Sequence, residues 1–246
     1  MKKYYSFLFA LSLTTISFLT MTSCQKENDE VIGIKDESRI DSRANSNAVL
    51  YPPSAHPFGK SLAEWGQEFS KDAYALDCEG WNLQLLFSLD NNVVAPFLSL
   101  SETSMDINIT KEQAIFMPLI FIVNDYPCPD PDFEPAEGQS LEDFLQEGAG
   151  PYIDVVETLD VVLDGVALGD IIGDYRFISD LFYFTGNAEL ADCIDPCITG
   201  QSQAGVAAGF FIMFKKMKTG QHTIEVHGEM PVYEFEWDIT FNVTVE

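Results

Sequence analysis

Length, composition and charge limit the chain to a small set of protein classes. Its 246 residues can form one all-β domain, and a hydrophobic content of 46%, with 19 Phe, is enough to fill a core. The 13 basic and 39 acidic residues give a net charge of -26, which repels phosphate backbones and anionic lipid headgroups. We therefore expect no nucleic-acid partner.

The first residues have the pattern of an export signal. Two lysines precede an apolar run over residues 4–21, and Thr22, Ser23 and Cys24 follow. A charged start, an apolar middle and small residues before the cleavage point are typical of a secretory signal peptide. The position of the cysteine resembles a bacterial lipobox, which implies that residues 1–23 are removed and that Cys24 is acylated. An uncleaved membrane anchor is the alternative, but the run is short for a span and rich in Ser and Thr.

A polar segment separates Cys24 from the first predicted element. Its acidic start, residues 25–30, resembles the signal that exports Bacteroidetes lipoproteins to the outer leaflet. Residues 24–50 contain few large apolar side chains, so we predict a flexible acidic tether there and a single domain over residues 51–246. These features together predict a protein anchored by lipid to the outer membrane, at the cell surface.

The first predicted element is an amphipathic helix that begins after Ser61. Ser61 and Glu64 have the spacing of a capping box, in which each side chain accepts a hydrogen bond from the backbone of the other. Four apolar residues then fall on one helical face: Leu62, Trp65, Phe69 and Ala73. We expect this face to dock on a sheet.

The stretch Gly59-Lys-Ser-x-x-Glu-Trp65 resembles the start of a family of uncharacterised secreted bacterial proteins. Three later segments also match that family, namely residues 114–118, 159–165 and 220–224. The resemblance covers most of the chain after Phe58. It implies a shared fold and brings no known activity, cofactor or partner.

The remaining chain is a series of predicted strands. They are expected at residues 82–89, 93–100, 105–109, 114–123, 159–163, 166–168, 175–178, 181–185, 204–214, 221–227 and 233–245. In the last one, apolar and polar residues alternate from Tyr233 to Val245, which predicts one buried and one wet face. The fold class is therefore mostly β: an antiparallel β-sandwich of jelly-roll or immunoglobulin-like type, with an N-terminal helix and one or two short helices in the middle.

The middle of the chain contains a proline-rich acidic loop and a predicted short helix. Residues 126–135 cannot continue a ladder because alternate prolines lack the N–H donor. Asp130, Asp132 and Glu134 crowd this loop, and carboxylate oxygens at such spacing can bind calcium, although a solvated acidic loop is the alternative. Residues 140–147 predict a capped helix that ends at Gly148.

Four cysteines follow Cys24: Cys78, Cys128, Cys193 and Cys197. An even number in an exported chain favours two disulfides, for which three pairings exist. The short loop from Cys193 to Cys197 contains a proline that can bend it shut, so we predict Cys193–Cys197 and Cys78–Cys128. A four-cysteine zinc site is the alternative, but the spacing is unlike that of zinc knuckles.

Residues suited to catalysis are few and scattered. His222 and His227 are five apart on one predicted strand, so they point to opposite faces and cannot share a metal. His56, Glu64 and Trp65 are the candidate ligand-binding residues near the first helix. No catalytic set is recognisable, so we predict a non-catalytic surface lipoprotein that binds a glycan, a protein or a cell-wall component. The alternative is an extracellular hydrolase or lyase that uses carboxylates on a polysaccharide.

Overall fold

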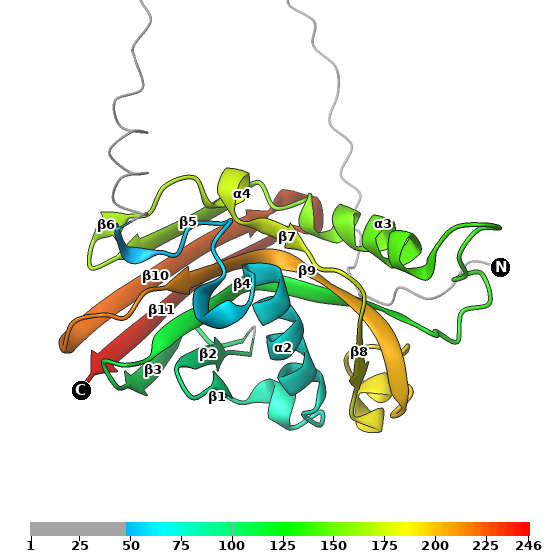
Figure 1. Ribbon diagram of the computed structural model, residues 1–246, viewed down its shortest axis with the longest axis horizontal. Coiled ribbons are helices and arrows are strands. Elements are labelled where there is room, and N and C mark those ends of the chain that lie inside the picture. Colours follow the sequence, from blue (N-terminus) through cyan, green and yellow to red (C-terminus); the bar gives the residue numbers. More distant parts are fainter. Residues whose placement is uncertain (1–47, 100) are drawn as a thin grey trace, which may run out of the picture. The chain divides into compact units, whose positions relative to one another are not determined.

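Two mixed β-sheets packed face to face form the body of the protein (Figure 1). The computed structural model describes residues 48–99 and 101–246, so the predicted signal peptide, Cys24 and most of the predicted tether lie outside the described residues. None of the helices in the described ranges is both long enough and apolar enough to cross a membrane.

The six-stranded sheet has the order β1-β2-β4-β9-β7, with β8 also paired to β9. Its strands are β1 (Leu85–Asp90), β2 (Val93–Phe97), β4 (Ala114–Tyr126), β7 (Arg176–Ile178), β8 (Phe182–Thr185) and β9 (Ser202–Phe214). The five-stranded sheet has the order β3-β11-β10-β5-β6. Its strands are β3 (Ser104–Ile109), β5 (Thr158–Leu163), β6 (Val166–Ala167), β10 (Gly220–Met230) and β11 (Phe235–Val245).

The predicted β-sandwich with few helices is confirmed, but two of the strand pairs are parallel: β2 with β4, and β3 with β11. The chain leaves the six-stranded sheet after β2, places β3 in the other sheet, and returns to lie beside β2 in the same direction. Such a crossover connects parallel neighbours, whereas a tight hairpin connects antiparallel ones. The other strand pairs of the described residues are antiparallel.

Helix α2 (Leu62–Tyr74) covers the six-stranded sheet, where it packs mainly on β9 (Figure 1). The predicted capping box of Ser61 and Glu64 is present. Gly66 allows the close approach, because a Cβ there would lie 2.4 Å from a ring carbon of Phe211. Trp65 and Phe69 are buried at this contact. The apolar helical face read from the sequence is therefore the face that completes the core.

Helix α3 (Leu141–Ile153) is longer than the sequence predicted, because it continues through Gly148 and Pro151. Gly148 lies against β4, and a Cβ on it would approach the Asn124 amide nitrogen to 2.5 Å. The glycine thus serves close packing rather than helix termination. The remaining described α-helix is α4 (Ile171–Asp174), a single turn between β6 and β7.

The terminal strand β11 confirms the predicted alternation in its C-terminal half. Phe241, Val243 and Val245 are buried between the sheets. Phe235 and Trp237 are only half-buried. Tyr233 belongs to a 3-10 turn and is exposed, so the strand begins two residues later than predicted.

The folded body begins before the predicted boundary at Tyr51. Leu50 has no exposed surface and bridges to Phe214, and the Lys215 amide donates to the Val49 carbonyl at 2.8 Å. Leu50, which the sequence assigned to the tether, therefore pairs with the end of β9, and Val49 is hydrogen-bonded to the residue that follows this strand.

Candidate functional site

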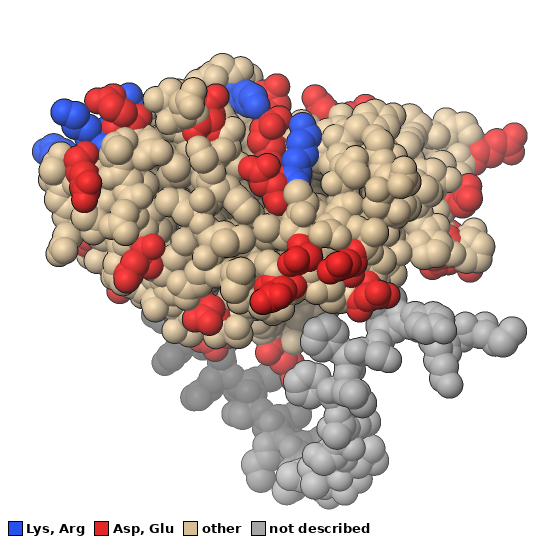
Figure 2. Space-filling view, turned by 90° about the horizontal axis from the view of Figure 1, so that it is seen from below, with Lys and Arg blue, Asp and Glu red and all other residues tan. Residues whose placement is uncertain are grey.

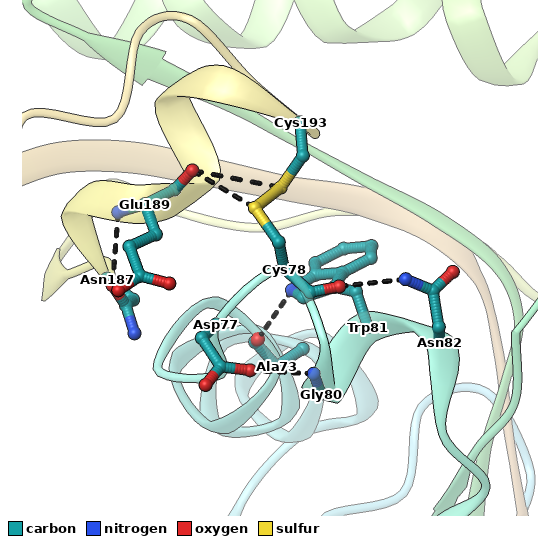
Figure 3. The surroundings of a disulfide bond; sticks show 9 residues. All are labelled: Ala73, Asp77, Cys78, Gly80, Trp81, Asn82, Asn187, Glu189 and Cys193. Carbon is teal, nitrogen blue, oxygen red and sulfur yellow. Dashed lines mark hydrogen bonds between the residues drawn. A yellow bond between two sulfur atoms is a disulfide. The ribbon is translucent and has the colours of Figure 1, made fainter.

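Two disulfides join Cys78 to Cys193 and Cys128 to Cys197, so the existence of two disulfides is confirmed and the predicted pairing is wrong. The Cys193 amide donates to the Leu190 carbonyl and the Cys197 amide to the Asp195 side chain, so the two cysteines lie in successive turns and each is bonded to a different partner segment. Figure 3 shows the first disulfide, with the Glu189 carbonyl oxygen 3.1 Å from Cys78 Sγ. Proximity in the sequence favoured a small loop, but tertiary packing determines which sulfur atoms meet.

The predicted ligand-binding residues near α2 do not form an open site. Trp65 has no exposed surface, and its indole nitrogen donates to the Pro57 carbonyl at 3.0 Å. Glu64 accepts the Ser61 amide at 2.6 Å, and this bond lowers the pKa of the Glu64 carboxyl. His56 lies on the surface at the start of this segment. Two of the three residues therefore stabilise the start of α2.

The predicted calcium ligands Asp130, Asp132 and Glu134 all lie exposed in the proline-rich loop. Asp130 Oδ1 accepts the Asp132 amide at 2.9 Å, which makes a local turn. Among the described residues, the structure gathers metal-ligand atoms in two other places, and neither includes this loop. These carboxylates are close together in the sequence, but their oxygen atoms do not converge in the structure.

The first of these places is a carboxyl pair beside the second disulfide, formed by the buried Asp125 and the half-buried Asp195. Asp125 ends the apolar run of β4 and is 2% exposed, whereas Asp195 comes from the turn between the two cysteines. Gln203 of β9, also 2% exposed, donates from Nε2 to Asp125 Oδ2 and to the Cys197 carbonyl. Its Oε1 accepts from the amide and the hydroxyl of Thr199, both at 2.9 Å.

Burial changes the protonation of this pair. Burial first, and then the neighbouring Asp195 carboxylate, raise the pKa of Asp125 to about 8. Burial also raises the pKa of Asp195, although the Cys197 amide stabilises its charged form. At neutral pH Asp125 therefore keeps its proton and the pair carries one charge instead of two. Cys197 is in the disulfide, so its sulfur is not a metal ligand here.

The second place is an exposed cluster on the outer face of the five-stranded sheet. His227 of β10 lies directly opposite Asp238 of β11, and Glu229 lies opposite Glu236. His227 Nδ1 is 2.9 Å from Asp238 Oδ1, and Thr158 donates to Glu229 at 2.9 Å. His222, by contrast, is paired with Val243 on the inner side, as its five-residue spacing from His227 predicted.

Exposed aromatic and aliphatic groups gather where β10 turns into β11. We call this the aromatic tip: Val232, Tyr233, Phe235 and Trp237. Val232 is 65% and Tyr233 is 54% exposed. The rings of Phe235 and Trp237 are stacked with centroids 5.4 Å apart, and Trp237 lies close over Gly228 of β10. The tip therefore presents apolar surface on a rigid base.

Charge on the surface is mostly acidic, as the composition predicted. Figure 2 shows one face of the molecule, where acidic side chains are distributed widely and basic ones are few. The fold and these sites define a β-sandwich with two disulfides, one buried acid pair and one exposed aromatic tip.

Comparisons with known proteins add little to this description. No family model matches the chain. No curated protein matches it either. Among solved structures it is similar to the cysteine protease inhibitor EhICP2 from Entamoeba histolytica, at 9% identity over 63% of this chain and 95% of that chain, with a TM-score of 0.23. The solution structure of Amebosin matches at 14% identity over 59% of this chain and 90% of that one, with a TM-score of 0.18. Scores this low support no conclusion on function.

Proposed function

We propose that the protein is a non-catalytic cell-surface lipoprotein that binds an uncharged glycan through the aromatic tip. The single observation that carries the proposal is the exposure of Tyr233 and Val232 beside the stacked rings of Phe235 and Trp237. Soluble proteins seldom keep such a group of large apolar side chains in water without a partner. The export pattern that ends at Cys24 supplies the location.

The chemistry of the tip favours a sugar over an acidic or an aliphatic ligand. The negative face of an aromatic ring attracts the weakly positive C–H groups on one face of a sugar ring. The exposed carboxylate of Glu234 lies in the same segment and can accept hydrogen bonds from hydroxyl groups. The net charge of -26 opposes an anionic polymer, so an uncharged glycan fits this surface best.

The alternative, a carboxylate-dependent hydrolase or lyase, has weaker support. The Asp125–Asp195 pair has the raised pKa that a general acid needs. Asp125, however, is 2% exposed, and its carboxyl group is already bonded to Gln203. A substrate oxygen would have to replace these partners before it could be protonated.

The proposal is tested with a glycan array probed by the full-length exported protein in detergent. We expect Tyr233→Ala to weaken binding of the retained glycan by about tenfold, the loss expected for about 1.4 kcal/mol of stacking. Tyr183→Ala is the matched control, because Tyr183 of β8 is 64% exposed and lies outside the tip. An array on which no glycan is retained would overturn the proposal, and so would equal losses in the two variants.

A further inference from the structure

We propose that His227, Glu236 and Asp238 form a binding site for a divalent transition-metal ion of the zinc type on the outer face of the five-stranded sheet. This inference is independent of the glycan proposal, because Phe235 and Trp237 of the tip point to the opposite face of β11 from Glu236 and Asp238. It rests on the register of β10 and β11 and on the kinds of ligand atom that this register brings together.

The register places the three side chains on one face. His227 pairs with Asp238, and Glu236 is two residues before Asp238 on β11, so all three point away from the core. One ligand atom from each residue lies within 4.8 Å of the other two. In a tetrahedral zinc site with bonds of about 2.1 Å, ligand atoms are about 3.4 Å apart. The ligand atoms would therefore have to approach one another by about 1.4 Å at most, a distance within the reach of side-chain rotation.

The backbone under the site is held from both sides. β10 is hydrogen-bonded to β11 on one side and to β5 on the other, and β11 is also paired with β3. Ligands on adjacent central strands keep their spacing better than ligands on a loop. This distinguishes the cluster from the proline-rich acidic loop, whose carboxylates do not converge.

Charge gives a second and independent reason to expect a cation. Glu229 and Glu236 lie directly opposite each other on adjacent strands. Like charges in that position destabilise a sheet, and a divalent ion beside them turns the repulsion into attraction. Asp160 of β5 also lies opposite His227, on the side away from Asp238. With Glu225, two residues before His227, the fold thus concentrates five carboxylates around one imidazole.

The mixed ligand set indicates which ions fit. Calcium and magnesium prefer oxygen ligands, whereas an imidazole nitrogen with two carboxylates suits zinc and its neighbours. Three protein ligands leave a fourth position for water. The Asp238 side chain is 76% exposed, so an ion can enter from solvent without any opening of the fold.

Protons compete with the metal for His227. The groups that face its imidazole are Asp160 on β5, Glu225 and Glu229 on β10, and Glu236 and Asp238 on β11. The hydrogen bond to Asp238 is the main cause of a raised His227 pKa, with smaller contributions from Glu229 and Glu236. Because only the neutral imidazole binds a metal, protons and the metal ion compete for this ring.

The test is a calorimetric titration of Zn²⁺ into the full-length protein, purified without a histidine tag and stripped with a chelator. We expect one site per chain at pH 7.5. His227→Ala and, as a milder change that keeps the shape, Asp238→Asn should each weaken binding at least tenfold. A thermal melt in chelator verifies that both variants are folded.

His222→Ala is the matched control. His222 lies on the same strand, five residues away, and is bonded to Asp164 at 2.7 Å on the inner side. We expect the His222→Ala variant to bind Zn²⁺ with the same affinity as the unchanged protein. Equal affinity in the unchanged protein and in His227→Ala would overturn the proposal. So would several weak sites per chain, or displacement of Zn²⁺ by an equal concentration of Ca²⁺, because each outcome would assign binding to the general acidic surface.

Discussion

The Asp125–Asp195 pair and the exposed cluster of His227, Glu236 and Asp238 both bring carboxyl groups close together, but their surroundings are opposite. In the first, the neighbouring groups are Gln203 and backbone atoms, and Asp125 is 2% exposed. In the second, an imidazole lies between carboxylates that remain in contact with water. In each cluster, a residue on a strand contacts a residue from another segment of the chain. The two clusters therefore differ mainly in how deeply their carboxyl groups are buried.

This difference determines what each cluster does with its charge. Inside the protein, two adjacent negative charges cannot both be stabilised, so the pKa of Asp125 rises to about 8 and one proton is retained. At the surface, water screens the repulsion between the carboxylates, and the hydrogen bond to Asp238 raises the pKa of His227 instead. Buried acids of this kind fix a segment in place, whereas exposed ones are available to a cation.

Replacement of Gln203 by Ala should show how strongly the buried pair depends on its partners. The change leaves Asp125 and the Cys197 carbonyl without the amide donor and leaves Thr199 without its acceptor. We expect the free energy of unfolding to fall by about 2–4 kcal/mol, the cost of unsatisfied buried polar groups. Urea unfolding at pH 7 measures it.

The control for this variant is Gln221→Ala, at an exposed position on β10. Surface substitutions of that kind change stability by about 0.5 kcal/mol or less. If the two glutamine variants lost equal amounts, the hydrogen-bond network around Asp125 would not be a source of stability.

Asp125→Asn should change how stability depends on pH. Asparagine keeps the shape of the protonated acid, so it can still donate to Asp195 and accept from Gln203. In the native protein the folded-state pKa of about 8 exceeds the ordinary value of 3.8. The stabilising contribution of Asp125 is therefore fully present below pH 3.8 and is lost as the pH rises through 8.

Relative to the asparagine variant, the unchanged protein should thus become less stable between pH 5 and 8. We expect the difference between the two free energies of unfolding to change by about 1–2 kcal/mol over this range. A rigid site would give a larger change, but the turn that contains Asp195 can move and admit water. Thermal melts across this range measure it. Parallel stability curves for the two proteins would show that Asp125 titrates with its ordinary pKa.

Much of the fold could be predicted because its signals are local. The capping box of Ser61 and Glu64 lies within four residues, and the alternation that ends at Val245 needs only the period of a strand. The cysteine pairing could not be predicted this way. Cys78 and Cys193 are 115 residues apart, and they meet because the Asn187 amide donates to the Tyr74 carbonyl at the end of α2, a contact that no local pattern reports.

The candidate sites were harder to predict for the same reason. The sequence suggested that the strand after Ala114 ends at Val123, because Asn124 and Asp125 are polar, yet β4 continues to Tyr126. The signal in the sequence that could have indicated the carboxyl pair was Asp125 itself, a charged residue at the end of a long apolar run. His227 and Asp238 were on two correctly predicted strands, but their contact depends on the register, which the turn at residues 231–233 determines.

The smallest expected effect concerns Glu236, on the exposed side of the comparison. Glu236→Gln removes the repulsion from Glu229, so in a chelator at low salt we expect a gain of up to about 0.5 kcal/mol. The gain should disappear in high salt, because screening already weakens the repulsion there. Glu225→Gln is the control, since Glu225 lies opposite Thr240 and should gain less.

Zinc should reverse the order of these two proteins in a thermal melt. An ion that binds only the folded state stabilises the unchanged protein by an amount that grows with its concentration. Glu236→Gln lacks one ligand, so it should gain less and become the less stable of the two. If Glu236→Gln stayed more stable than the unchanged protein at every zinc concentration, Glu236 would only repel Glu229. The exposed cluster would then be an ordinary acidic surface and not a zinc site.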